Sequence, residues 1–262
     1  MKHSILKLSL LSSTILLAAC VTSSPTGRNQ VLLFDGAEMA KLGANSFIEM
    51  KAQETISQDP KVNSYVQCVS KQITDTLGKQ SDFDQWEVVV FDSEQVNAFA
   101  LPGGKIGVYT GLLQVAKNQD QLAAVIGHEI AHVQANHSNE RLSSSQITGY
   151  GTQIAQTAIG STEYSAMGMA ALGLGVQYGI TMPYGRAQES ESDILGLHLM
   201  NDAGFDAQQS IELWKNMAKA SGGSEPMEFL STHPSNETRI NNLQNELKKL
   251  TKSTKKSPTC TL

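Results

Sequence analysis

The chain has 262 residues, with 20 basic and 25 acidic side chains and a formal net charge of −5 at pH 7. An acidic balance without a basic patch outside the C-terminal end excludes the electrostatic signature of nucleic-acid-binding proteins, so we expect no nucleic acid among its partners. The length suffices for one well-buried domain.

The first 20 residues have the features of an export signal. Lys2 and Lys7 give a basic start, and the apolar stretch that follows is interrupted by hydroxyl residues and short for a membrane-spanning helix. Leu-Ala-Ala-Cys at 17–20 resembles the bacterial lipobox, in which the cysteine carries the lipid. We therefore predict a signal peptide at 1–19 and lipidation of Cys20. An ordinary signal peptide or a short membrane anchor is the alternative.

The residue after the predicted lipid site bears on localisation. Val21 is not the aspartate that would favour retention in the inner membrane. We therefore expect a lipidated tether over residues 20–34, anchored at the periplasmic face of the bacterial outer membrane.

The remaining chain alternates between helical and strand patterns in one predicted domain, residues 35–250, followed by a basic polar tail at 251–262. Asp59-Pro60 pairs an N-cap residue with a proline at the first helical position, which indicates a helix start. Runs of β-branched and aromatic residues indicate strands. The sequence predicts helices from 36 to 57 and from 60 to 77, strands at 86–91, 97–101 and 105–110, and helices thereafter.

The most informative stretch is the sequence HEIAH, which begins at His128. Asn118 and Gln121 have capping-box spacing, so a helix can start there. Residues four apart share a helix face, so His128 and His132 can bind one Zn²⁺. Glu129 lies beside them and can act on water as a general base. The alternative is a solvated helix face with two unrelated histidines.

A catalytic zinc site needs a third protein ligand. Ser138 stands where the HExxHxxGxxH pattern would have its third histidine, and we interpret His137 as a helix-end residue. Glu189 and Asp193 share a face of a downstream helix. We predict Glu189 as the third ligand, with Asp193 accepting the far N–H of a zinc-binding histidine.

Two further residues of the acidic helix are interpreted from their spacing to Glu189. Arg186, one turn before Glu189, is expected to orient that carboxylate, and Glu191 points away and is expected to be solvated. An ordinary acidic helix is the alternative for Glu189 and Asp193.

Residues 164–185 carry no charge and are rich in glycine, alanine and methionine. A single membrane crossing here would place His132 and Glu189 on opposite sides of the membrane, and glycines disfavour a stable helix. We predict a mobile hairpin or lid over the cleft, with Met167, Met169 and Met182 as an adaptable apolar surface.

Cysteine content provides a second indication of compartment. Besides Cys20, only Cys68 and Cys260 are present. Two cysteines in an oxidising compartment often pair, so we predict a disulfide that fastens the C-terminal tail to the domain. Zinc binding by these residues is disfavoured, because neither belongs to a CxxC pair.

Together these motifs resemble the M48 family of zinc metallopeptidases, and most of all its periplasmic, lipoprotein-type members. HExxH and ExxxD carry the resemblance. It extends to the strand segments at 97–104 and 106–112, to Asn136-His137 with Glu140-Arg141, and to His233-Pro234 with Arg239-Ile240. It covers about residues 35–248.

The resemblance implies an α+β, gluzincin-like zincin domain, mostly helical, with one Zn²⁺ per chain and a small sheet whose edge strand binds substrate. We predict that this edge, at Asn97, Ala98, Phe99 and Ala100, pairs with an extended peptide; plain core packing of Phe99 is the alternative. By resemblance, His233 lies near the metal, where it either stabilises the oxyanion or occupies the fourth zinc position.

The implied function is zinc-dependent endoproteolysis of unfolded or misassembled envelope proteins, in which Glu129 moves the proton. Its implied partners are such substrates, the outer membrane through the lipid, and envelope assembly machinery. Two alternatives remain: a chaperone or adaptor lipoprotein for outer-membrane assembly with little proteolysis, and a zinc hydrolase acting on cell-wall peptide.

Overall fold

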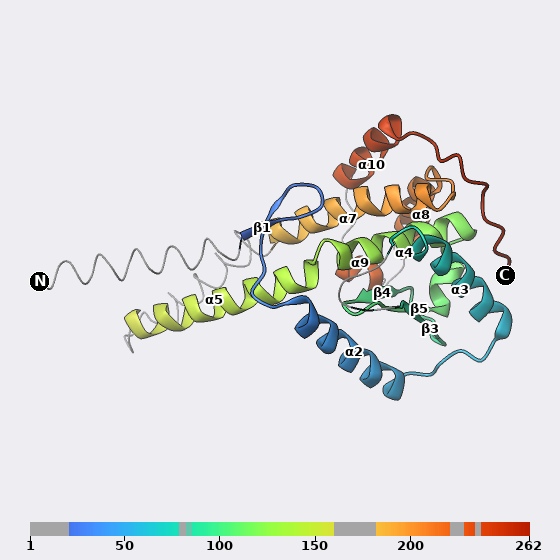
Figure 1. The fold of residues 1–262 in the computed structure, drawn as a ribbon. Helices are drawn as coiled ribbons and strands as arrows, with labels where there is room; N and C mark the ends of the chain where they lie inside the picture. The colour runs from blue at the N-terminus through green and yellow to red at the C-terminus, as the bar shows by residue number, and fades with distance from the viewer. Residues whose placement is uncertain (1–20, 79–82, 84, 160–181, 221–227, 234–236) are drawn as a thin grey trace, which may run out of the picture.

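The computed structural model describes residues 21–78, 83, 85–159, 182–220, 228–233 and 237–262. The predicted signal peptide, Cys20 and all but the end of the predicted lid at 164–185 lie outside these residues. Figure 1 shows helices gathered around a small sheet, with one long helix, α5, projecting away from them. Among the described residues, no helix is both long and apolar enough to cross a membrane.

Two small sheets are present in the described part of the chain. The central one has the order β3-β5-β4, in which β3 pairs parallel with β5 and β4 pairs antiparallel with it. The other is an N-terminal hairpin of β1 and β2. The strands span Val21–Ser23 (β1), Asn29–Val31 (β2), Glu87–Phe91 (β3), Ala98–Leu101 (β4) and Lys105–Tyr109 (β5).

Two helices precede the central sheet, and both start where the sequence places a cap. In α2 (Gly36–Gln53), Asp35 and Glu38 form a complete capping box. In α3 (Pro60–Thr74), Asp59 accepts from the backbone of the first turn and Pro60 occupies the first helical position. Helix α3 packs on α4 and β3, whereas α2 lies against β4 and β5.

The central element is α4 (Gln119–Gln134), which is buried along most of its length. It follows the 3-10 helix η1 (Thr110–Gln114), and it packs most extensively on α7 (Met182–Asp202). Gly127 and Gly196 permit this close approach: a Cβ on Gly127 would lie 2.9 Å from the Gly196 carbonyl oxygen. A Cβ on Gly196 would lie 2.7 Å from the His128 backbone nitrogen. The helix crossing is therefore fixed by two glycines beside the first histidine of HExxH.

The remaining described helices are α5 (His137–Ile159), α8 (Gln209–Ala220), α9 (Glu228–Thr232) and α10 (Glu237–Lys249). Of these, α8 packs on α4 and α10 packs on α7. The predicted disulfide is confirmed, because Cys68 on α3 is bonded to Cys260 in the C-terminal tail. Gln119 also holds the tail, accepting from the Cys260 N–H at 2.8 Å and donating to the Pro258 carbonyl at 2.8 Å.

The apolar interior has two parts. The larger joins α3, the sheet, α4, α7, α8 and α10. The smaller is an aromatic cluster of Phe47, Phe91 and Tyr109, against which Phe99 packs. The fold is thus α+β and mostly helical, as predicted.

Candidate metal centre

Four side chains converge at one buried point between α4, α7 and the end of α9. His128 and His132 come from one face of α4, Glu189 from α7, and His233 directly follows α9. One ligand atom of each lies within 4.8 Å of the others, and all four residues are buried. The structure therefore brings the three predicted metal ligands together with His233.

The distances describe a compact set of donor atoms. The Nε2 atom of His128 lies 3.1 Å from His132 Nε2 and 3.2 Å from His233 Nδ1. The carboxylate of Glu189 lies 3.0 Å from His233 Nδ1, 3.3 Å from His128 Nε2 and 3.4 Å from His132 Nε2. Facing ring nitrogens at such distances need a proton or a cation between them.

The donor chemistry fits Zn²⁺, which binds imidazole nitrogen and carboxylate oxygen. Burial alone would raise the pKa of Glu189, but hydrogen bonds from the three histidines outweigh it and keep this carboxyl ionised. Burial also holds the pKa of His132 well below its usual value, which favours the neutral, metal-binding ring.

Glu129 lies next to these donors and is itself buried. Its Oε1 atom has no hydrogen-bond partner among the described residues and lies 3.4 Å from His233 Nε2. A buried carboxylate oxygen without a partner is costly, so it marks a functional position. Glu129 thus places one carboxylate oxygen beside His233 at the metal centre.

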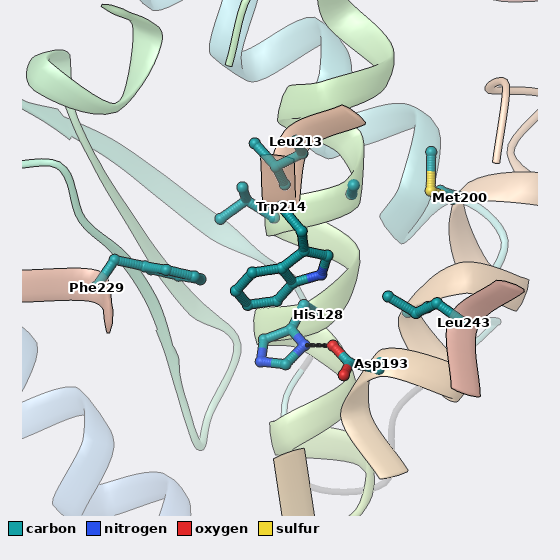
Figure 2. A pocket seen from close by; sticks show the side chains of 10 residues that line it. His128, Asp193, Met200, Leu213, Trp214, Phe229 and Leu243 are labelled. Carbon is teal, nitrogen blue, oxygen red and sulfur yellow. Dashed lines mark ion pairs between the residues drawn. The ribbon is translucent and has the colours of Figure 1, made fainter. Parts of the chain in front are cut away.

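Asp193 and Arg239 contact the metal ligands on the side away from the proposed metal position. Figure 2 shows the Asp193 carboxylate facing the far nitrogen of His128, at 3.1 Å from Nδ1. Arg239 contacts Asp193 through Nε at 2.6 Å and Glu189 through Nη1 at 3.2 Å. Arg186 is exposed, so the structure gives to Arg239 the orienting role predicted for Arg186.

Aromatic side chains pack against two of the histidines of the metal centre. Phe229 stacks on His233 with ring centroids 4.6 Å apart, and Trp214 meets His128 edge-on at 6.3 Å. Trp214, Phe229 and His128 (Figure 2) line a cavity, which has a volume of about 20 Å³. Neither aromatic residue belongs to a motif that predicts a site, although the amphipathic spacing of Leu213, Trp214 and Met217 indicates a buried face.

One residue near the centre keeps its predicted position with unexpected contacts, and another differs from its prediction. His137 begins α5, as expected of a helix-end residue, but it is fully buried and lies 2.8 Å from His132 through the two Nδ1 atoms. Glu191 is buried and contacts His137, Thr26 and Arg28, so the expectation of a solvated side chain is wrong. Burial lowers the pKa of His137 to about 4, which keeps its ring neutral.

The predicted substrate strand is β4, at one edge of the central sheet. Ala98 and Ala100 are buried toward the main core, and Phe99 packs over Gly107 into the aromatic cluster. Asn97 accepts from the N–H of Ala98 at 2.9 Å. Phe99 is partly buried against this cluster. Among the described strands, β4 pairs on one side only, so the binding of a peptide at this edge stays a prediction.

A cavity of about 180 Å³ opens beside the metal ligands. It lies between the β4–β5 turn, the start of α2 and the C-terminal end of α4, and its lining includes His132, Pro102 and Asn136.

The comparisons with known proteins agree with this geometry. Residues 60–247 match Peptidase family M48. The chain is 37% identical over 181 residues to the mitochondrial metalloendopeptidase OMA1 of Schizosaccharomyces pombe, covering 69% of this chain and 51% of that protein. It is 34% identical over 210 residues to that of Saccharomyces cerevisiae, covering 77% and 54%.

A bacterial relative is more distant. The chain is 27% identical over 218 residues to the beta-barrel assembly-enhancing protease of Escherichia coli K12, covering 80% of this chain and 44% of that protein. The chain thus spans about half the length of the curated relatives it matches.

Proposed function

This chain belongs to peptidase family M48, whose members are zinc metallopeptidases, and we propose that it is an endopeptidase that cleaves unfolded or misassembled proteins of the bacterial envelope. The single observation that carries this proposal is the buried convergence of His128, His132 and Glu189, with Glu129 beside them. In this arrangement, residues of the HExxH and ExxxD motifs lie together at one site.

When bound, Zn²⁺ supplies a Lewis acid that polarises the scissile carbonyl and makes water more acidic. Glu129 takes the proton of the attacking water at its carboxylate and returns it to the leaving amine. Asp193 holds His128 in the tautomer whose Nε2 faces the centre. Arg239 keeps the carboxylates of Asp193 and Glu189 in place.

We propose that the substrate binds as a polypeptide segment in an extended conformation. Strand β4 lies against α4 and offers one unpaired edge among the described strands, so a peptide can add to it by main-chain hydrogen bonds. Main-chain pairing reads no sequence, and most of the backbone of a folded domain is already hydrogen-bonded within that domain. The proposal of unfolded or misassembled substrates rests on these two points.

The proposed location rests on residues outside the described structure. The sequence at 17–20 resembles a lipobox, which supports anchoring through Cys20 at the outer membrane. The Escherichia coli relative is named for β-barrel assembly, which supports substrates from outer-membrane assembly. Labelling with a radioactive fatty acid should mark the parent protein and not Cys20→Ser; label in both would contradict lipidation at this position.

The test of activity is cleavage of a loosely folded protein by the zinc-loaded chain. Fragments are expected from the parent and from Glu212→Gln, an α8 control substitution, but not from Glu129→Gln, although all three retain zinc. Cleavage by Glu129→Gln would contradict the assigned base. Zinc-loaded parent and His233→Ala chains that both yield no fragments would contradict the endopeptidase proposal.

A further inference from the structure

His137 occupies a position that the catalytic scheme does not use. It is the first residue of α5, its exposed fraction is 0%, and both ring nitrogens have partners. Its Nδ1 lies 2.8 Å from His132 Nδ1, and its Nε2 lies 3.1 Å from Glu191 Oε2. A buried histidine that links a metal ligand to a carboxylate calls for a physical explanation.

We propose that His137 is a positioning residue that fixes the metal-binding tautomer of His132, and that the N-terminal hairpin completes this support through Glu191. The inference rests on the metal centre of the proposed function. It adds a continuous line of contacts from His132 through His137 and Glu191 to the loop between β1 and β2.

The positions of the protons follow from the geometry. His132 directs Nε2 toward His128 and Glu189, so in the metal-binding form its single proton is on Nδ1. That N–H needs an acceptor, and His137 Nδ1 is in place to accept. The proton of a neutral His137 is then on Nε2, where it donates to the Glu191 carboxylate, which can only accept. Each contact in the line contains one proton.

Two neighbours compete with this arrangement. Arg141 Nη2 lies 3.1 Å from the same His132 Nδ1, and a guanidinium can only donate. That hydrogen bond requires the opposite tautomer of His132, whose Nε2 proton blocks metal binding. The Ser192 hydroxyl lies 3.2 Å from His137 Nδ1 and can donate there. The 2.8 Å contact with His137 is the shorter of the two at His132, so we assign to His137 the selection of the binding tautomer.

The far end of the line is held by the hairpin. The hydroxyl of Thr26 donates to Glu191 Oε1 at 2.6 Å, and Arg28 Nε donates to Oε2 at 3.0 Å. Arg28 also clamps Glu140 near the start of α5. The loop between β1 and β2 thereby fixes the carboxylate against both α5 and α7. Its effect on the metal should be smaller than that of His137, because it acts through two intervening residues.

The first test measures zinc affinity by competition with a chromophoric chelator. Loss of a partner that orients a metal ligand typically weakens metal binding about 10–100-fold, and we expect this for His137→Leu. His137→Asn should recover most of the affinity, because its Oδ1 replaces the accepting ring nitrogen. Thr26→Val, which removes one hydroxyl, should give a smaller loss. His198→Asn, a substitution of a half-exposed histidine away from the centre, should match the parent.

Circular dichroism of each variant controls for folding, and a second measurement needs no variant at the site. Long-range ¹⁵N–¹H spectra of the zinc-loaded parent should show His137 neutral with its proton on Nε2, and His132 with its proton on Nδ1. A proton on His137 Nδ1 would overturn the inference. So would a folded His137→Leu chain that binds zinc within about twofold of the parent, since the expected loss is about 10–100-fold.

Zinc binding and proteolysis together distinguish a wrong role for His137 from a wrong proposed function. A parent chain that binds no zinc would overturn both. A parent that binds zinc with the expected His137 tautomer and affinity losses, yet cleaves no protein, would overturn the endopeptidase proposal and leave the role of His137 established.

Discussion

Arg239 and Asp193 form a buried bidentate ion pair directly behind the metal ligand His128. The Nε atom of Arg239 lies 2.6 Å from Asp193 Oδ2 and its Nη2 atom lies 2.7 Å from Oδ1. The face of Trp214 covers the guanidinium at 4.2 Å. Because Arg239 also contacts Glu189, one arginine holds both a metal-binding carboxylate and the carboxylate that supports the metal ligand His128.

Replacing Arg239 should therefore damage both stability and metal binding. Arg239→Met leaves Asp193 without its buried cation, and breaking a buried pair in this way costs about 3–5 kcal/mol. Arg239→Lys should fall between that variant and the parent, because an ammonium group cannot form the two-pronged contact. Urea unfolding of the metal-free chains measures the difference. An unchanged free energy of unfolding for Arg239→Met would refute the role assigned to this pair.

Much of the fold and the centre of the site could be predicted because their signals are local. Asp59-Pro60 marks the start of α3, and β3, β4 and β5 begin and end within one residue of the predicted strands. The four-residue spacing within HExxH fixes which histidines share a face. Glu189 and Asp193, four residues apart on α7, then supply the carboxylates that face these histidines.

The surroundings of the metal ligands depend on how the helices cross, which spacing along one helix does not reveal. The sequence points to Arg186, one turn before Glu189, whereas the packing of α10 on α7 brings Arg239 to the buried side. Glu191 lies two residues from Glu189 and so faces another direction. That face is covered by the N-terminal hairpin, a contact across 163 residues between Arg28 and Glu191.

His233 Nδ1 lies within the ligand set, at 3.2 Å from His128 Nε2, which favours its role as an occupant of the fourth position. We therefore predict that His233→Ala cleaves a loosely folded protein faster than the parent, because a position on the metal becomes available to substrate. Rates should be compared at saturating zinc, since the loss of one donor also weakens binding of the metal. A slower His233→Ala enzyme would favour the oxyanion-stabilising role instead.

The disulfide between Cys68 and Cys260 closes a loop of 192 residues in sequence separation. In the chain-entropy account, cross-links over long loops constrain the unfolded chain most, and loss of a native disulfide costs about 2–5 kcal/mol. The double substitution Cys68→Ser, Cys260→Ser should lower the free energy of unfolding by this amount in urea. Reductant should produce the same loss in the parent and none in the double variant. An equal response of both chains to reductant would contradict this account.

Glu140 links stability to pH through the N-terminal hairpin. Burial alone would raise its pKa, but hydrogen bonds from Arg28, Gln188 and Gln30 outweigh it and lower the pKa below the ordinary value. A carboxyl with a depressed pKa in the folded state stabilises the fold above its unfolded pKa of about 4.3, and this contribution is lost as the pH falls through the folded value.

Glu140→Gln should therefore be less stable than the parent by about 2 kcal/mol at pH 7, the usual scale for hydrogen bonds to a charged group. The difference should shrink as the pH falls below about 4, where the parent carboxyl begins to protonate and comes to resemble the amide. Unfolding free energies measured across this range provide the comparison. Glu212→Gln, which removes a half-exposed carboxylate paired with Lys215 on α8, should differ little from the parent at any pH. A Glu140→Gln deficit that stays constant from pH 7 to 3 would show that packing of the side chain, and not its charge, holds the hairpin in place.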